Sequence, residues 1–402
     1  MSTAVIVEAV RTPIGKRRGS LSGWHPVELA GATIAELVER AGIDPALIDD
    51  VIVGCVTQIG PQSTNIARNA ALAAGLPETV PGTTIDRQCG SSQQAVHFAA
   101  QAVLSGAMDI VIAAGVECMS TVAMFSNAPG GDIREVYGEQ LQARYADRET
   151  FGTPGLVPQG LSAELIVEKW GLTRAELDDY ALASQQRAAT ARAEGRFDRE
   201  TFAVTRKVRD KDSGEITIDG ELTADEPIRE NTTAEGLAAL KPSFLPEGSV
   251  TAGNASQIVD GAAAVLVMRD DVAEKLGLKP RAAIRQMTVV GDDPVAMLTA
   301  PIPATQKALE KADLSVDDID LFEVNEAFAP VVLAWQRELK ADVDKLNVNG
   351  GGISLGHPLG ASGARLMVTL LHELERTGGR YGLQTMCEGG GMANATIIER
   401  LS

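Results

Sequence analysis

Short apolar runs alternate with amphipathic segments along most of the chain. The runs with the length and composition of strands lie at residues 5–10, 50–56, 110–115, 262–269, 320–324 and 393–400. The segments with the apolar spacing of helices lie at residues 29–41, 93–104, 177–193, 304–312 and 364–375. Strands and helices alternate in both the first and the last part of the chain, so we predict an α/β protein in which helices cover sheets.

One alignment register relates the first part of the chain to the last part. Residues 41–43 align with residues 312–314, and the same offset extends without a gap over further segments. It pairs Ile48 with Ile319, Val53 with Val324, Cys89 with Gly360 and Val116 with Cys387. Each pairing alone is weak evidence, but the shared register predicts a duplicated unit with its chemistry where the two copies meet.

Cys89 lies where a strand-like segment ends and a helix of small residues begins. Unpaired backbone N–H groups and the positive end of the helix dipole favour the thiolate there, and such settings lower a cysteine pKa from about 8.5 to about 3.5–7.5. For a cysteine taken alone, a buried structural thiol is the commoner interpretation. We nevertheless expect Cys89 to be a nucleophile with a lowered pKa, because two further segments carry matching chemistry.

Two glycine-rich segments hold these further reactive groups. His357 lies within residues 347–363, where the glycines predict tight turns and close approach of another group. Cys387 ends an apolar run, and glycines follow at residues 389–391. Backbone N–H groups of glycines after a strand end are candidate oxyanion donors.

These motifs together resemble the thiolase family, and the resemblance runs along nearly the whole chain. The motifs that carry it are residues 88–92, 325–328, 356–363 and Cys387 with its glycines, and residues 7–15 and 251–256 add to it. Residues 89–95 look most similar to those of actinobacterial degradative thiolases, including a member that degrades steroid side chains.

The resemblance implies a fold and a division of the chain. The thiolase fold has duplicated α/β halves in a five-layered αβαβα arrangement, with two helices buried between two sheets. Residues 1–119, completed by residues 250–274, would form the N-terminal half, and residues 275–402 the C-terminal half. Residues 120–249, which break the repeat and are rich in charge, would form an inserted loop domain that binds coenzyme A.

The resemblance also implies an acyltransferase reaction. A thiolase uses coenzyme A to cleave a 3-ketoacyl-CoA into acetyl-CoA and a shortened acyl-CoA, and it catalyses the reverse Claisen condensation. Cys89 would become acylated, His357 would take its proton, and Cys387 would be the second acid and base. Asn325 would hold a water beside His357 as one oxyanion hole, and the N–H groups of Cys89 and Gly389 would form the other.

Coenzyme A is expected as a cosubstrate, with no permanently bound cofactor and no metal. By resemblance, Arg229 packs on the adenine and Ser256 lies near the pantetheine arm. Residues 157–164 lack the His-Met-Gly segment of many short-chain acetoacetyl thiolases, so the acyl pocket is expected to differ. A wider pocket would accept medium-chain or ring-bearing acyl groups, as fatty acid β-oxidation or steroid degradation requires.

Composition limits the class of protein and its partners. The hydrophobic content of 45% is enough to bury a sizeable core. The length of 402 residues exceeds what a single hydrophobic core usually supports. The four cysteines lack metal-site spacing and disulfide density, which indicates a reducing compartment such as the cytoplasm. A net charge of −18 disfavours nucleic acid or an anionic membrane as a partner, and we predict no signal peptide or membrane span. By resemblance, we expect a homodimer or homotetramer that binds acyl-CoA substrates and coenzyme A.

Other functions remain open at this point. Acetoacetyl-CoA synthesis would use the same site in the opposite direction. A ketoacyl synthase shares the fold, yet that family pairs its cysteine with two histidines or with a histidine and an asparagine, whereas this chain has Cys387. A noncatalytic acyl-CoA- or lipid-binding relative is expected to lack at least one of Cys89, His357 and Cys387. Of the other histidines, His372 is expected to have a surface role.

Overall fold

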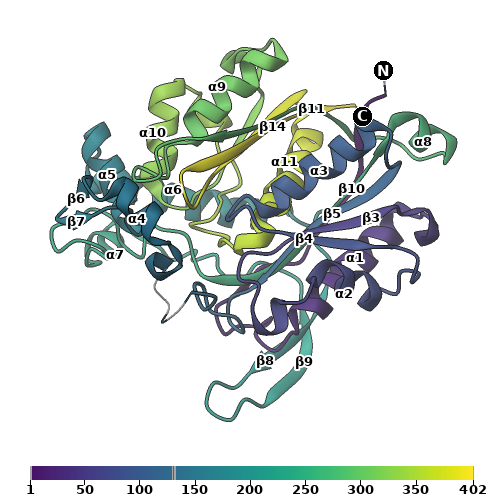
Figure 1. Cartoon of the computed structure of the whole chain (residues 1–402). Helices are drawn as coiled ribbons and strands as arrows, with labels where there is room; N and C mark the ends of the chain where they lie inside the picture. The colour runs from purple at the N-terminus through teal and green to yellow at the C-terminus, as the bar shows by residue number, and fades with distance from the viewer. Residues whose placement is uncertain (1, 129, 131–132, 402) are drawn as a thin grey trace.

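The computed structural model describes residues 2–128, 130 and 133–401. Within this range one ten-stranded sheet crosses the molecule in the order β12-β13-β14-β11-β1-β10-β5-β3-β4, with β2 beside β10 (Figure 1). One half of the sheet consists of β1 (Ala4–Arg11), β2 (Gly15–Lys16), β3 (Asp50–Gly54), β4 (Gly82–Ile85), β5 (Ile110–Cys118) and β10 (Val259–Arg269). The other half consists of β11 (Ala282–Gly291), β12 (Leu321–Val324), β13 (Tyr381–Glu388) and β14 (Met392–Arg400).

The central strands are buried on both faces, which is why they appear in the sequence as apolar runs. In β5, Ile110 and Ile112 pack into the outer core, whereas Val111 and Ala113 pack into the inner core. β3 is parallel to β4 and β5, and β12 is parallel to β13. Parallel pairing places the carboxyl ends of these strands at the same edge of each half, where the segments after β4 and β12 begin.

Helices complete five layers, as predicted. The outer face of the first half is covered by α1 (Pro26–Ala41) and α2 (Ile66–Ala73), and that of the second half by α9 (Pro301–Ala312) and α10 (Ala329–Leu339). Between the two halves lie α3 (Ser91–Ser105) and α11 (Ser362–Thr377), which share one core with both of them (Figure 1). The two halves of the ten-stranded sheet are continuous, because β1 pairs with β11. Val5 lies opposite Ala283, and Ile6 lies opposite Ala282.

The duplication predicted from the sequence is confirmed in space. The same register that relates residues 41–43 to 312–314 aligns the bounds of β3 with those of β12, of α3 with α11 and of β5 with β13. Even the helix ends correspond, because Gly42 after α1 (φ 64°) and Asp313 after α9 (φ 56°) both adopt the left-handed conformation that terminates a helix.

The segment between the halves contains α4 (Glu139–Tyr145), β6 (Glu149–Thr150), β7 (Thr153–Pro154), α5 (Gln159–Trp170), α6 (Arg174–Ala193), β8 (Val204–Arg209), β9 (Ile216–Leu222) and α7 (Ala234–Ala238). After it the chain returns to the sheet as β10, between β1 and β5, and continues into α8 (Asp270–Lys275). The predicted strands and helices all lie within observed elements or overlap them, and β4 is the strand-like segment expected before Cys89. The elements that were not predicted are α2, α4, α5, α7, α8, α10, β2, β6, β7, β8, β9 and β11. Over the described ranges, no helix has both the length and the apolar character needed to cross a membrane.

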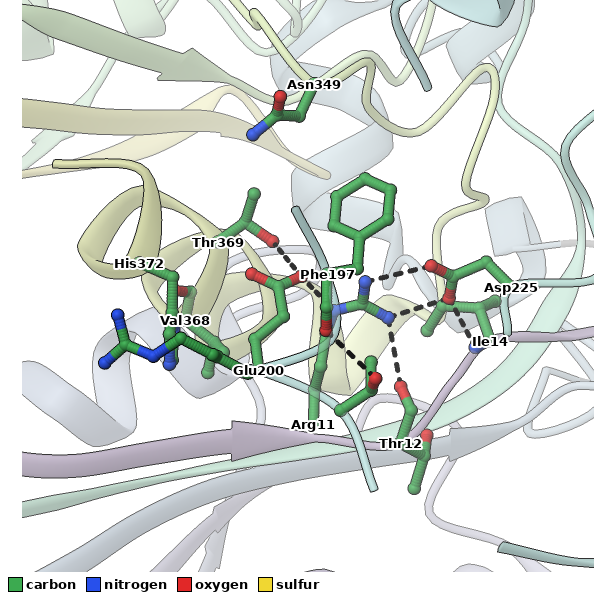
Figure 2. A network of polar contacts seen from close by, with 12 residues as sticks. Arg11, Thr12, Ile14, Phe197, Glu200, Asp225, Asn349, Val368, Thr369 and His372 are labelled. Atoms are coloured by element: carbon green, nitrogen blue, oxygen red, sulfur yellow. Dashed lines mark hydrogen bonds and ion pairs between the residues drawn. The ribbon is translucent and has the colours of Figure 1, made fainter. Parts of the chain in front are cut away.

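A buried ion network ties the inserted segment to the sheet and to α11 (Figure 2). Arg11 of β1 donates to Glu200 at 2.6 Å and to the two oxygens of Asp225 at 2.7 and 2.9 Å. Thr369 of α11 donates to the same Glu200 at 3.0 Å. Nearby, His372 is buried and its Nδ1–H donates to the Val368 carbonyl at 2.8 Å, so the expectation of a surface role was wrong.

We expect Arg11→Met to lower the free energy of unfolding by about 3–5 kcal/mol, because removing one member of a buried ion network leaves uncompensated charges. Chemical denaturation of the purified protein measures this loss. Arg380→Met is the matched control, since Arg380 pairs with Glu399 while its side chain is 65% exposed, and exposed pairs contribute at most about 1 kcal/mol. A loss for Arg11→Met no larger than the control would contradict the assigned role of the network.

Candidate active site

The predicted reactive residues lie where the two halves meet. Cys89 follows β4 and immediately precedes the Gly90 cap of α3. His357 lies in the glycine-rich segment before α11, Asn325 follows β12, and Cys387 lies near the end of β13. All four side chains are buried. The fold therefore brings them to the carboxyl ends of parallel strands and the amino ends of the two central helices.

Two hydrogen bonds define the state of the His357 ring. Ser362 Oγ lies 2.5 Å from His357 Nδ1 and donates its own proton to the Pro358 carbonyl at 2.9 Å. A hydroxyl has one proton to donate, so Oγ accepts the hydrogen of Nδ1 and the Nε2 lone pair is left as the basic site. The Asn325 amide nitrogen lies 3.4 Å from Nε2. Burial lowers the pKa of His357 to about 3, with the Arg365 charge as a smaller cause, so the ring is neutral at rest.

The structure contradicts the expected lowering of the Cys89 pKa. Burial raises this pKa to about 12, and the nearby Glu388 carboxylate adds to the rise. The backbone N–H hydrogen bond at the helix start acts in the opposite direction but is outweighed, because a thiolate removed from water loses more than one helix terminus restores. Cys89 is therefore a thiol at rest, and it can act as a nucleophile only if a base accepts its proton.

Cys387 shares the environment of Cys89. Burial raises the pKa of Cys387 well above its usual value, and repulsion by the negative charge of Cys89, when that residue is ionised, is the next largest cause. Leu359, two residues after His357, and Met386, next to Cys387, pack in the same cluster as Cys89. A Cβ atom at Gly389 would lie 2.9 Å from the side-chain oxygen of Gln88, which places this glycine beside the residue before Cys89.

Comparison with known proteins identifies the family. The model of the thiolase N-terminal domain matches residues 4–271, and the model of the thiolase C-terminal domain matches residues 278–400. The chain belongs to the thiolase family. The family, fold and acyltransferase class predicted from the sequence motifs are thereby confirmed.

Similar proteins cover the whole chain. The steroid 3-ketoacyl-CoA thiolase FadA6 of Mycobacterium tuberculosis is 50% identical, over 100% of this chain and 95% of its own length. An acetyl-CoA acetyltransferase of Chromobacterium violaceum is 45% identical, over 98% of this chain and 99% of its own length. The crystal structure of the Bacillus anthracis acetyl-CoA acetyltransferase matches with a TM-score of 0.87 at 42% identity, and that of human mitochondrial 3-ketoacyl-CoA thiolase with 0.86 at 36%. Both structural matches cover 100% of this chain and 99% of the other.

The thiolase site includes a buried acid that the sequence analysis missed. Both carboxylate oxygens of Glu388 are buried and have no hydrogen-bond partner among the described residues, and a Cβ atom at Gly90 would lie 2.0 Å from Oε1. Burial raises the pKa of Glu388 to about 8, against an opposing effect of the Arg87 charge. Its counterpart in the first half is Glu117, whose carboxylate accepts four hydrogen bonds, including one from Gly360 N at 2.9 Å. The repeat register pairs these two acids, which is the signal that could have revealed Glu388.

Two cavities of this thiolase adjoin the predicted ligand-binding residues. A cavity of about 30 Å³ beside Cys89 is bordered by Met124, Phe125 and Gln159, the last from the segment that departs from short-chain thiolases. A separate cavity of about 630 Å³ is lined by both Arg229 and Ser256. Lys16 and Arg17 also line this cavity, and neither was predicted from the sequence as a binding residue.

We expect Ser362→Ala to slow acylation of Cys89 by about 10- to 100-fold, which is part of the 10²–10⁴-fold that a general base contributes. Without the acceptor at Nδ1, the His357 proton can move to Nε2 and remove the basic lone pair. Single-turnover acylation across a pH series, with ¹⁵N spectra of the ring, measures both effects. Ser354→Ala is the control, because Ser354 is buried in the same segment but bonds to Ser184 at 2.9 Å. Equal losses in the two variants would contradict a specific role for Ser362.

We expect Glu388→Gln to lower the pKa of the Cys89 thiol. Above pH about 8 the Glu388 carboxylate is ionised and opposes a second negative charge at Cys89, so a neutral amide removes that opposition. Each unit of decrease raises the rate of thiol alkylation at about pH 9 roughly tenfold. Glu399→Gln, at the opposite end of the β13–β14 ladder, removes the same charge as a control. An alkylation profile for Glu388→Gln that superposes on the wild-type profile would show that Glu388 does not influence this thiol.

Proposed function

We propose that this thiolase uses coenzyme A to cleave 3-ketoacyl-CoA into acetyl-CoA and a shortened acyl-CoA, and catalyses the reverse condensation, through an acyl-Cys89 intermediate. The observation that carries the proposal is that a protonated Cys89 and a neutral His357, whose Nε2 keeps its lone pair as a proton acceptor, are both buried before the amino ends of the packed helices α3 and α11. A nucleophile that is not ionised at rest requires such a base next to it. Relatives named 3-ketoacyl-CoA thiolase, such as that of Idiomarina loihiensis at 43% identity, support the same reaction.

In the first half-reaction, Cys89 Sγ attacks the 3-keto carbon while its proton passes to His357 Nε2. The bond between carbons 2 and 3 then breaks, and its electron pair goes to carbon 2, which takes a proton from the Cys387 thiol. Acetyl-CoA leaves, and the acyl group stays on Cys89 as a thioester. The site now holds a protonated His357 and a Cys387 thiolate.

In the second half-reaction, coenzyme A attacks the acyl-Cys89 carbonyl. Its thiol proton passes to the Cys387 thiolate, and His357 returns its proton to the departing Cys89 sulfur. The shortened acyl-CoA leaves, and both cysteines and the histidine are restored. Cys387 thus acts once as an acid and once as a base, and its burial supports this role because a dry site keeps the exchanged proton from bulk water.

Negative charge develops on oxygen in each half-reaction and needs donors. We assign one oxyanion site to Asn325 and His357, acting with a bound water. The side-chain nitrogen of Asn325 lies 3.4 Å from His357 Nε2. We assign the other to the backbone N–H groups of Cys89 and Gly389. Loss of one such donor typically reduces the rate about 10²–10³-fold.

Coenzyme A would occupy the large cavity. Arg229 is exposed at its wall and can pack on the adenine, and Ser256 lies further along the same wall, where a pantetheine arm would pass. In this division residues 120–249 form the loop domain that supplies Arg229, while residues 1–119 with 250–274, and residues 275–402, form the catalytic halves.

The acyl group would extend into the small cavity beside Cys89. At about 30 Å³ it holds roughly the volume of one water, so a ring-bearing acyl group requires the side chains of Met124 or Phe125 to move aside. The 50% identity to a relative named for steroid 3-ketoacyl-CoA supports bulky acyl groups and the degradative direction for this chain as well. We further propose a cytoplasmic homodimer or homotetramer.

We expect Cys89→Ala to abolish thiolysis, whereas Cys387→Ala still accepts an acyl group on Cys89 but does not break the carbon–carbon bond. Loss of the absorbance of a 3-ketoacyl thioester measures thiolysis, and mass spectrometry detects the acyl-enzyme. The assay uses acetoacetyl, longer-chain and ring-bearing substrates. Cys55→Ala is the control, because Cys55 is an equally buried free thiol outside the proposed roles. Near-normal turnover in either catalytic variant would disprove these roles.

A further inference from the structure

A row of three cations lies at the edge of the large cavity. Lys16, Arg17 and Arg18 are consecutive and exposed, in a chain whose net charge is −18. Lys16 and Arg17 line the cavity together with Arg229. Among the described residues, no carboxylate forms an ion pair with any of these cavity-lining cations. Within the described lining of this cavity, Lys16, Arg17 and Arg229 face a single carboxylate, Glu226, so the lining is net positive on an acidic protein and attracts anions.

The turn that carries the cations is held rigidly by an acid that does not neutralise them. Glu226 accepts hydrogen bonds from Lys16 N at 3.0 Å, from Ser20 N at 3.0 Å and from Ser20 Oγ at 2.5 Å. A Cβ atom at Gly19 would lie 2.3 Å from Glu226 Oε2 and 2.9 Å from the Lys16 carbonyl oxygen, so a larger residue there would displace this carboxylate from the turn. Glu226 lines the same cavity, but its oxygens are directed to the turn.

The turn is also anchored to the sheet beside the pantetheine side of the cavity. Lys16 of β2 pairs with Val259 of β10, and Ser256, Gln257 and Ile258 precede that strand along the cavity wall. Arg229 approaches from the inserted segment and donates to Gln257 at 3.0 Å. The cations thus converge on one space from two separate parts of the chain.

We infer that Lys16 and Arg17 form an anion subsite that takes the phosphate groups at the nucleotide end of coenzyme A. The inference rests on the proposed function, because it needs coenzyme A as the cosubstrate. Arginine offers a planar set of donors that matches phosphate oxygens, and lysine adds a mobile charge. Both the 3′-phosphate and the diphosphate of coenzyme A have this chemistry. The subsite explains how a strongly acidic protein attracts an anionic cosubstrate.

The test compares coenzyme A, 3′-dephospho-coenzyme A and pantetheine as thiol acceptors in thiolysis. For the double variant Lys16→Gln/Arg17→Gln we expect KM for coenzyme A to rise about 10-fold or more, since charge-assisted hydrogen bonds to phosphate are lost. The KM for pantetheine, which has no phosphate, should stay within twofold, as should kcat. If KM of the double variant for 3′-dephospho-coenzyme A equals that of the wild type, the subsite binds the 3′-phosphate. If KM of the variant for 3′-dephospho-coenzyme A is also raised, the subsite binds the diphosphate.

The control is Lys275→Gln/Lys311→Gln, which removes two charges from α8 and α9, away from the cavity-lining residues. An equal rise in KM for coenzyme A in the control, or an unchanged ratio of KM for coenzyme A to KM for pantetheine in the test variant, would overturn the subsite. Should the wild-type protein cleave no 3-ketoacyl thioester, the proposed function fails instead. Calorimetric binding of coenzyme A and pantetheine to the two variants then still decides whether the cations bind phosphate.

Discussion

The approach of α3 to α11 at backbone distance is the constraint on which the rest of the structure depends. A Cβ atom at Gly363 would lie 2.2 Å from the backbone nitrogen of Gln93, so a larger residue there would force the two helices apart. Cys89 precedes one helix and His357 precedes the other. Close contact between the helices therefore places both residues of the proposed proton transfer at the junction of the two halves, although they are far apart along the chain.

Enclosure of these helices between two sheets has an electrostatic consequence. Removal of water raises the pKa of Cys89 to about 12 and lowers that of His357 to about 3, so both groups are neutral until a substrate is attacked. The proton then has to pass directly between neighbours. The duplicated halves differ in this respect, because Glu117 accepts four hydrogen bonds, whereas Glu388 faces Gly90 and accepts none from the part of the chain that the structure describes. One copy of the acid supports the backbone, and the other leaves a titratable group beside the reactive thiols.

The inserted segment contributes to both stability and ligand binding. Glu200 and Asp225 enclose Arg11 of the sheet, and Thr369 links this network to α11 (Figure 2). The next residue after Asp225, Glu226, holds the turn that presents the cations of the large cavity. The inserted segment thus holds α11 through Glu200 and shapes the proposed coenzyme A subsite through Glu226. A substitution in the buried ion network is therefore also expected to displace the turn that carries Lys16 and Arg17.

Much of the fold could be predicted, because each long apolar segment buries a continuous face whatever its neighbours are. β11 was not predicted, since Arg285 and Gln286 interrupt its apolar residues. The sequence alone determined the candidate reactive groups and the repeat that relates their segments. Only the tertiary structure decided that Cys89 rests as a thiol and that Ser362 orients His357. Those properties depend on burial and on contacts made across the packed halves, which outweigh the local effect of a helix terminus.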